Sequence, residues 1–306
     1  MTTDAALAPL DRYKQLLDAH LTKLVDGRHL PAVHDAPPAR VAVDRGAAWA
    51  WLVVDPAATA PLDLLAPLLV GDFDPHDAEV VDRAGHARPA LLGLLCYAAL
   101  QAVAASDRML VGEQAESAAC SVDALAASAD RSAAALPDAV PAADGAKLAA
   151  IAWAALAAHR GGELLHDDRT VAAAGRAFRA IIARQAPAGP YLVATARDNP
   201  ETLWFHELQV AHAVASYALQ SGEAGALASG RRAAAWHLNE TQPDHATNQP
   251  WGLTAFLAEP DARVMADGLL HAAAVQQAAG DAPAEPDAVT LILLADALYS
   301  LRRYRG

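Results

Sequence analysis

The chain contains little positive charge, few aromatic side chains and only two cysteines. Its 306 residues carry 23 Lys and Arg against 36 Asp and Glu, which gives a formal net charge of −13. Because neutralising nucleic-acid phosphates requires clustered Lys and Arg, this balance argues against DNA or RNA as a partner. Cys96 and Cys120 form no Cys-x-x-Cys pair, so a zinc or redox motif of that type is excluded. This cysteine usage fits a reducing compartment, and we expect a cytoplasmic protein.

The sequence also lacks a stretch typical of a secretory signal or a membrane span. Residues 1–10 include Asp4 and no basic residue ahead of an apolar stretch, which is unlike a signal peptide. The uncharged run that comes nearest to membrane length, residues 89–106, is short for a span, rich in alanine and interrupted by Gln101. We therefore predict a buried helix there and no membrane partner.

Glycine motifs for nucleotide or nucleophile chemistry are missing as well. The sequence contains no G-x-x-x-x-G-K-[ST], no G-x-G-x-x-G and no G-x-S-x-G. Phosphate-cradling loops and the nucleophile elbow of α/β-hydrolases therefore lack support.

What the sequence does contain is a regular alternation of two kinds of predicted helix. Apolar residues make up 54% of the chain and charged residues 19%, a balance that favours a packed globule over a solvated tail. Five segments are apolar on every side: residues 89–106, 147–158, 204–220, 251–258 and 289–301. Four segments between them carry a charged stripe: residues 113–131, 170–184, 223–239 and 261–277. We expect the first kind to lie inside the fold and the second kind to face solvent.

From residue 204 onward the apolar helices recur at intervals of roughly 40 residues, the length of one helical hairpin. This layout resembles the α/α-toroid enzymes, rings of antiparallel helical hairpins found in many glycosidases, polysaccharide lyases, sugar epimerases and terpene cyclases. The resemblance covers about residue 87 to the C-terminus and rests on layout. We predict an all-α fold with one toroid-like domain over residues 1–306. Within it, residues 1–86 form an N-terminal arm or incomplete hairpin, with a helix at 4–25 and an extended stretch at 40–54. Terpene cyclase activity is disfavoured, because the Asp-rich D-x-D-D motif and the abundant aromatics of those enzymes are missing.

The first group of candidate functional residues lies in a predicted loop, residues 239–252, that contains two prolines. The candidates are Asp244 and His245 for catalysis, and Asn248, Gln249 and Trp251 for substrate binding. The same residue types also serve turns and helix caps, so Thr247 or Asn248 has the alternative role of capping the helix that follows.

The second group lies on the predicted helix 204–220. A helical wheel places five polar side chains on one stripe: His206, Gln209, His212, Ser216 and Gln220. Glu207 falls on the apolar side instead, where a carboxylate needs partners because an isolated buried charge is costly. Burial of that kind raises a carboxyl pKa, which suits a general acid or base. The alternative is a Glu in the first turns of a helix that pairs with Arg197.

Three further features have structural explanations. Asp198 followed by Pro200 and Glu201 is a capping-box pattern, with Asp198 as the predicted N-cap. Asp296 is the only acid in an apolar helix, so it needs a hydrogen-bond partner, an arginine or a loop. His237 lies on a predicted outer helix, and we expect it at the surface.

These residues lead to one main hypothesis and two alternatives. In the main hypothesis, Glu207 and Asp244 form an acid–base pair at the mouth of the ring, and His206 and His245 orient it or move protons. Substrate contacts are then assigned to Trp204, Trp251, Asn248, Gln249, Arg197 and Gln209. Two carboxylates flanking a bond are the equipment of glycoside hydrolysis, and lyase or epimerase chemistry is a close alternative. The resemblance to toroid enzymes implies a carbohydrate, a uronate or a similar polar ring as substrate.

The first alternative is a metal-dependent enzyme, and the second is a non-catalytic helical scaffold that binds a partner. Metal ligands would then come from His206, His212, Asp244 and His245, although the i, i+4 histidine spacing of helical zinc sites is missing. No cofactor is predicted in the main hypothesis, and a divalent metal belongs to the first alternative. The expected partner is a small-molecule or saccharide substrate, and a homo-oligomer remains open.

Overall fold

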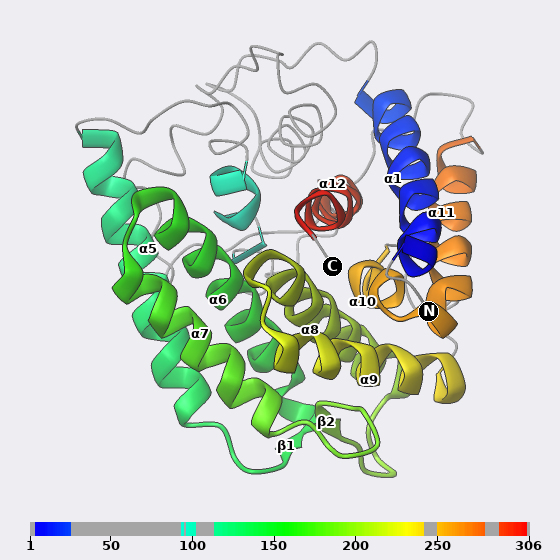
Figure 1. Cartoon of the computed structure of the whole chain (residues 1–306). Helices are drawn as coiled ribbons and strands as arrows, with labels where there is room; N and C mark the ends of the chain where they lie inside the picture. Colours follow the sequence, from blue (N-terminus) through cyan, green and yellow to red (C-terminus); the bar gives the residue numbers. More distant parts are fainter. Residues whose placement is uncertain are drawn as a thin grey trace.

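A computed structural model describes residues 4–25, 93–94, 96–101, 113–241, 250–278 and 288–304 (Figure 1). This part of the chain is mostly helical, so the all-α prediction is confirmed. Its α-helices are α1 (Asp4–Val25), α5 (Glu113–Ala134), α6 (Gly145–Leu165), α7 (Asp168–Ala183), α8 (Pro200–Ser221), α9 (Ala224–Glu240), α10 (Leu253–Ala258), α11 (Arg263–Ala278) and α12 (Ala288–Arg303). Two 3-10 turns, η3 (Ala142–Asp144) and η4 (Pro260–Ala262), precede α6 and α11. The extended segment predicted at residues 40–54 lies outside the described residues.

The strand content of the described chain is one short pair. Strands β1 (Val140–Pro141) and β2 (Leu192–Val193) run parallel, with Val140 opposite Leu192. They join the connection before α6 to the connection before α8, and both lie at the same end of the helices (Figure 1).

The predicted alternation of buried and one-sided helices is present in the described residues. Helices α10 and α12 are buried on nearly every side, as is α8 from Glu207 onward, and α6 is buried along most of its length. Helices α5, α7 and α9 each bury one face and expose the other. Residues 93–94 and 96–101, inside the predicted buried helix 89–106, are helical and buried.

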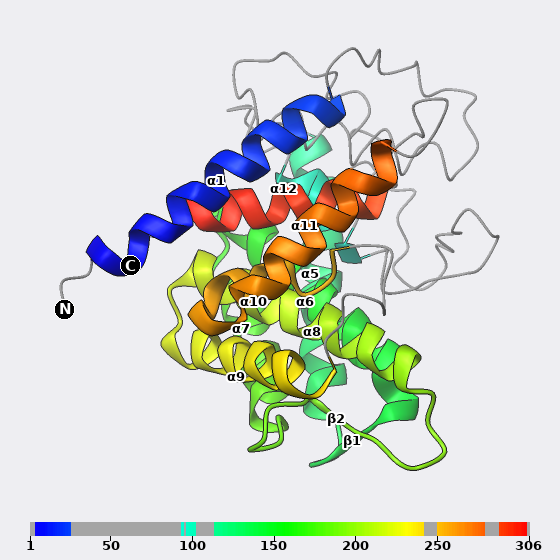
Figure 2. The same ribbon diagram turned by 90° about the vertical axis from the view of Figure 1, so that its right-hand side faces the viewer.

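Packing follows the same division. Helix α6 contacts α5, α7 and α8, whereas α8 contacts α6, α9, α10 and α12. Helix α12 is seen end-on near the middle of Figure 1, and α1 lies along it. Figure 2, turned by 90°, shows α12 side-on, behind α11. None of the helices in the described ranges combines the length and the apolar character needed to cross a bilayer.

Local hydrogen bonds and backbone conformation set the ends of α8, and the observed N-cap differs from the predicted one. The N-cap is Asn199, whose side-chain oxygen accepts hydrogen bonds from the backbone N–H groups of Glu201 at 2.9 Å and Thr202 at 3.4 Å. Asp198 accepts instead from the backbone N–H of Thr195 at 2.6 Å. The physical reason is Pro200: proline is favoured at the first helical position, which makes its immediate predecessor the cap. The helix ends at Gly222, whose φ of 76° suits a residue without a side chain.

His237 on α9 is fully buried, so its predicted surface position is wrong. Helix α9 contacts α8, α10 and α7, which leaves a narrower exposed stripe than its arginines suggest. Gly230 allows the close approach to α8, because a Cβ atom at that position would lie only 3.3 Å from the Cβ of Ala215. The His237 ring packs against Trp236 and Phe256, and its Nδ1 atom lies 2.8 Å from the Thr241 hydroxyl.

Candidate functional site

A buried carboxylate, Asp296 on α12, forms the centre of the polar residues in the core. The polar stripe predicted on α8 faces it, since His212, Ser216 and Gln220 all bind its oxygens. Asp296 and His212 have no solvent exposure. The partner that Asp296 needs is therefore a set of neutral hydrogen-bond donors and a histidine, rather than an arginine or a loop.

Donors from several elements surround the two oxygens of Asp296. Oδ1 accepts from the Tyr97 hydroxyl at 2.5 Å, the Ser300 hydroxyl at 3.3 Å and Gln220 Nε2 at 3.4 Å. Oδ2 accepts from the Ser216 hydroxyl and lies 3.0 Å from His212 Nε2. Hydrogen bonds of this number compensate for the loss of water around a buried charge.

Among the described residues, hydrogen-bond partners reach only one ring nitrogen of His212. Its Nε2 atom lies 3.0 Å from Asp296 Oδ2 and 3.0 Å from the Thr254 hydroxyl. Toward an ionised carboxylate Nε2 must donate, because such a carboxylate only accepts hydrogen bonds. In the neutral imidazole the proton then sits on Nε2, and Nδ1 carries the lone pair. Nδ1 is buried and has no hydrogen-bond partner in the described part of the chain.

Tyr97 links this centre to a second residue group. Burial, followed by the nearby Asp296 carboxylate, raises the pKa of the Tyr97 hydroxyl well above its usual value, so the group stays protonated and donates. The hydroxyl also accepts from Gln101 Nε2 at 2.6 Å and Gln220 Nε2 at 2.5 Å. Arg160 Nε in turn donates to Gln101 Oε1 at 2.9 Å. Arg160 is thus linked to Asp296 through Gln101 and Tyr97.

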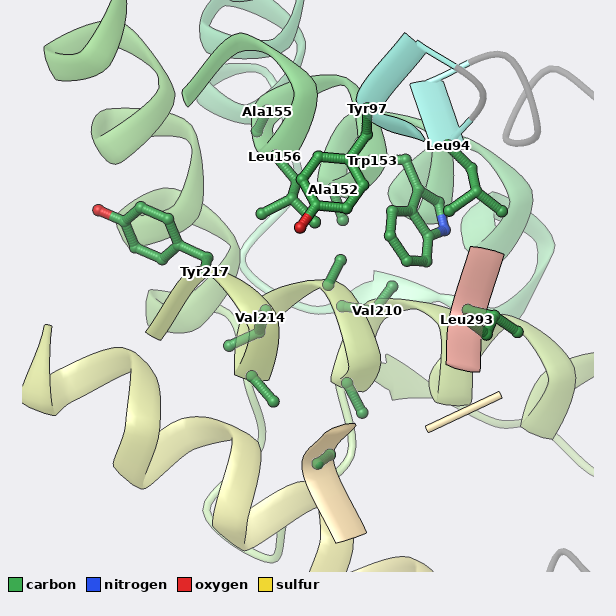
Figure 3. Packing of buried hydrophobic residues seen from close by; sticks show 14 of the residues in the cluster. Leu94, Tyr97, Ala152, Trp153, Ala155, Leu156, Val210, Val214, Tyr217 and Leu293 are labelled. Carbon is green, nitrogen blue, oxygen red and sulfur yellow. The ribbon is translucent and has the colours of Figure 1, made fainter. Parts of the chain in front are cut away.

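Aromatic rings border the centre on the side of α6. The Tyr97 and Trp153 rings lie side by side above α8, with centroids 6.5 Å apart (Figure 3). Their polar atoms point to opposite sides: the indole nitrogen of Trp153 lies toward Leu94 and Leu293, away from the Tyr97 hydroxyl (Figure 3). The Trp153 ring also lies 5.7 Å from the His212 ring and 6.2 Å from the Trp251 ring.

Glu207 is buried as predicted, and main-chain groups bind both of its oxygens. The backbone N–H of Tyr191 donates to Oε2 at 3.0 Å, and the backbone N–H of Leu192 donates to Oε1. Burial raises the pKa of Glu207 to about 8, although the two backbone hydrogen bonds act in the opposite direction. The described contacts of Glu207 thus hold strand β2 against α8, and they do not include Arg197, whose side chain is exposed.

The other predicted residues are placed in part. Gln209 is 1% exposed and Trp251 is packed in the core, whereas Trp204 and His206 are half-buried. Trp251 lies edge-on to Phe205, with ring centroids 5.5 Å apart. Four predicted site residues lie outside the described residues: Asp244, His245, Asn248 and Gln249. The convergence of Glu207 with Asp244 and His245 therefore stays a prediction.

The metal-site alternative also depends on residues beyond the described ranges. Among the described residues, no three His, Cys, Asp or Glu side chains lie close enough together to hold a metal ion. His212 and Asp296 supply two such groups, and the predicted ligands Asp244 and His245 lie outside the described residues.

Tyr97, Thr254 and Ser300 are members of the site that the sequence did not single out. Tyr97 and Gln101 are four residues apart in an apolar helix, a spacing that places them on one face. That spacing was the available signal for Tyr97. Thr254 and Ser300 carried none, because an isolated hydroxyl in an apolar helix is common and needs no partner from another helix.

Comparison of the chain with known protein families, with curated proteins and with solved structures finds no match in any of the three. The site therefore has to be interpreted from its own geometry.

Proposed function

We propose that this protein is an enzyme that performs acid–base chemistry on a small polar substrate, with His212 as the proton-transferring group. The supporting observation is the asymmetry of its ring: Nε2 is fixed by Asp296 and Thr254, whereas Nδ1 is buried and unpartnered in the described chain. A carboxylate that fixes one nitrogen of a histidine leaves the other nitrogen with a defined tautomer and direction. Such an arrangement suits a general base, which must be oriented before it accepts a proton.

In this proposal Asp296 is a positioning residue. Its hydrogen bonds to Ser216 and Tyr97 hold the carboxylate still, so that the imidazole is held still in turn. Asp296 also stabilises the imidazolium that forms when His212 takes a proton. Glu207, with both oxygens on backbone N–H groups, holds the strand pair and takes no part in proton transfer.

We also propose that the helices close into a toroid and that the substrate is a carbohydrate-like ring, with hydrolase, lyase or epimerase chemistry. The alternation of buried and one-sided helices supports this reading, as does the contact of α8 with both α10 and α12. The predicted loop residues Asp244 and His245 are candidates for the second catalytic group.

The test is a His212→Gln variant, because the glutamine amide can keep the hydrogen bond to Asp296 while it supplies no base at the Nδ1 position. Wild-type and variant proteins would be assayed on nitrophenyl glycosides and on uronate-containing oligosaccharides. We expect kcat to fall by about 100-fold or more in His212→Gln, the usual effect of removing a general base.

The matched control is His166→Gln, which changes an exposed histidine at the end of α6 and should leave kcat unchanged. A folded His212→Gln protein with wild-type turnover would rule out the proposed role. It would favour instead the non-catalytic alternative, in which the polar centre only holds the helices together.

A further inference from the structure

Beside the His212–Asp296 pair lies a second set of polar atoms without partners. In the described part of the chain, the buried atoms that lack a hydrogen bond include Trp153 Nε1, both amide atoms of Gln209 and His212 Nδ1. All three side chains are at most 1% exposed. Folded proteins rarely leave buried donors and acceptors unpaired, because each one loses its water without a replacement.

These atoms belong to one region of the core. Gln209 lies on α8 one helical turn from both Phe205 and His212, on the same face of the helix. The Phe205 ring contacts Trp251, and the His212 ring contacts Trp153, with centroids 5.5 Å and 5.7 Å apart. Trp153 and Trp251 also contact each other, with centroids 6.2 Å apart. Gln209 is therefore bracketed on α8 by two residues whose rings touch this tryptophan pair.

The charges around these atoms limit the ligand that could satisfy them. Both oxygens of Asp296 are already occupied by donors, so a cationic ligand would find no free acceptor there. Within the described chain, no hydrogen bond, ion pair or cation–π contact joins an arginine or lysine to Trp153, Gln209 or His212, and Arg160 binds Gln101 and Glu163. An anionic ligand would be buried beside a carboxylate without a cation to pair with, which is strongly unfavourable.

Uncharged ligands remain, and the hydrogen-bonding pattern of the four atoms specifies which kind of uncharged ligand fits. Trp153 Nε1 and Gln209 Nε2 need acceptors, whereas Gln209 Oε1 needs a donor, as does His212 Nδ1 when the imidazole is neutral. A hydroxyl group is both donor and acceptor, so one molecule with several hydroxyls can serve all four atoms.

We infer that this region binds an uncharged, polyhydroxylated ligand, a neutral sugar or cyclic polyol rather than a uronate, through Gln209, Trp153 and Nδ1 of His212. The inference rests on the proposed function for the role of His212, and it narrows the substrate class by excluding the acidic sugars.

The experiment compares matched pairs of neutral and acidic ligands by titration calorimetry and ligand-observed NMR. The probes are glucose with glucuronate and galactose with galacturonate, together with myo-inositol, all at millimolar concentration. We expect at least one neutral compound to bind at least about tenfold more tightly than its acidic counterpart.

The variant Gln209→Met keeps the length of the side chain and removes its polar atoms. We expect it to weaken neutral-ligand binding by at least about tenfold. We also expect its midpoint of unfolding without ligand to stay at or above that of the wild type, because Gln209 makes no side-chain hydrogen bond in the described part of the chain. The control Gln15→Met, on the exposed face of α1, should bind as the wild type does.

Three results would overturn the inference: equal binding of a sugar and its uronate, wild-type affinity in Gln209→Met, or no binding of any neutral compound. The last result would mean that water alone satisfies these atoms. The proposed function fails separately. If neutral ligands bind in a Gln209-dependent way but His212→Gln retains full turnover, the ligand assignment stands and the catalytic role of His212 does not.

Discussion

Glu207 shows how one buried side chain can serve structure and still titrate. Its pKa of about 8 lies above the ordinary value of 4.5, mainly because burial disfavours the charged form. The folded state therefore holds this proton more tightly than the unfolded state does. The stabilising contribution is complete below pH of about 4.5 and is lost as the pH rises through about 8.

We predict that the free energy of unfolding decreases between these pH values and that Glu207→Gln removes much of this decrease. One pKa unit corresponds to about 1.4 kcal/mol, so the effect on the free energy of unfolding amounts to several kcal/mol over the range. Urea unfolding of both proteins at a series of pH values measures it. Glu201→Gln, an exposed change on the same helix, is the control. An unchanged slope in Glu207→Gln would contradict the assignment.

His237 changes the free energy of unfolding in the opposite direction, at acidic pH. Burial lowers its pKa from 6.5 to about 3, so the unfolded state binds the proton more readily. The wild-type protein should lose stability as the pH falls from about 6.5 toward 3, by about 1.4 kcal/mol per pKa unit of the shift. We predict that the free energy of unfolding of His237→Asn, whose amide can still reach Thr241, changes less over this acidic range, when unfolding is followed by circular dichroism. His166→Asn should show the pH dependence of the wild type. An equally weak pH dependence in that variant would contradict the assignment to His237.

At the scale of the helix, the cap of α8 distinguishes two adjacent residues. Asn199 accepts from two backbone N–H groups in the first turn, whereas Asp198 accepts from the backbone N–H of Thr195. We predict that Asn199→Ala lowers the free energy of unfolding by about 1 kcal/mol, the usual cost of a lost N-cap. Asp198→Ala should cost less, because its bond lies in an exposed turn outside the helix. Chemical denaturation measures both, and the reverse order would restore Asp198 as the cap.

The helices themselves could be predicted because their signals are local. The predicted segment at residues 4–25 has the bounds of α1, and residues 113–131 lie within α5. Periodicity also separated buried from one-sided helices, as in α8 and α7. These properties depend on residues three or four positions apart, which a single sequence displays directly.

The errors and omissions arise where distant elements meet. The sequence of α9, with its arginines, predicts a surface position for His237, and only the packing of α9 on its neighbours shows that the side chain is buried. The bond from Tyr97 to Asp296 joins residues 199 positions apart. A single sequence shows that Asp296 needs a partner but carries no measure of which residue will be near it. Similarly, the sequence allows Glu207 to pair with an arginine. In the fold, the backbone N–H groups of Tyr191 and Leu192, in the connection before α8, donate to it instead.

At the scale of the whole molecule, the polar centre joins elements from widely separated parts of the chain. Helices α8 and α12, residue Thr254 of α10 and Tyr97 all contribute atoms to it. The surrounding core is built largely from alanine and leucine, which allow many alternative packings. The hydrogen bonds that converge on Asp296 form together in only one of these packings, so they favour a single arrangement of the helices.

If the centre acts as one unit, removing donors from both oxygens of Asp296 should give non-additive effects. Tyr97→Phe removes one of the donors to Oδ1, and Ser216→Ala removes one of the donors to Oδ2. Each change should lower the free energy of unfolding by about 2 kcal/mol, the range for hydrogen bonds to charged groups. The double variant should differ from the sum by about 0.5 kcal/mol or more, as is typical of residues in one network.

The control pair is Tyr97→Phe with Ser229→Ala, because Ser229 belongs to a separate buried group with Tyr191 and Gln185. Its two effects should add, since the described hydrogen-bond partners of Tyr97 and Ser229 are different. Additivity in both pairs would mean that the donors around Asp296 act independently. In that case the carboxylate would not be held rigidly, and its capacity to orient His212 for proton transfer would lose its physical basis.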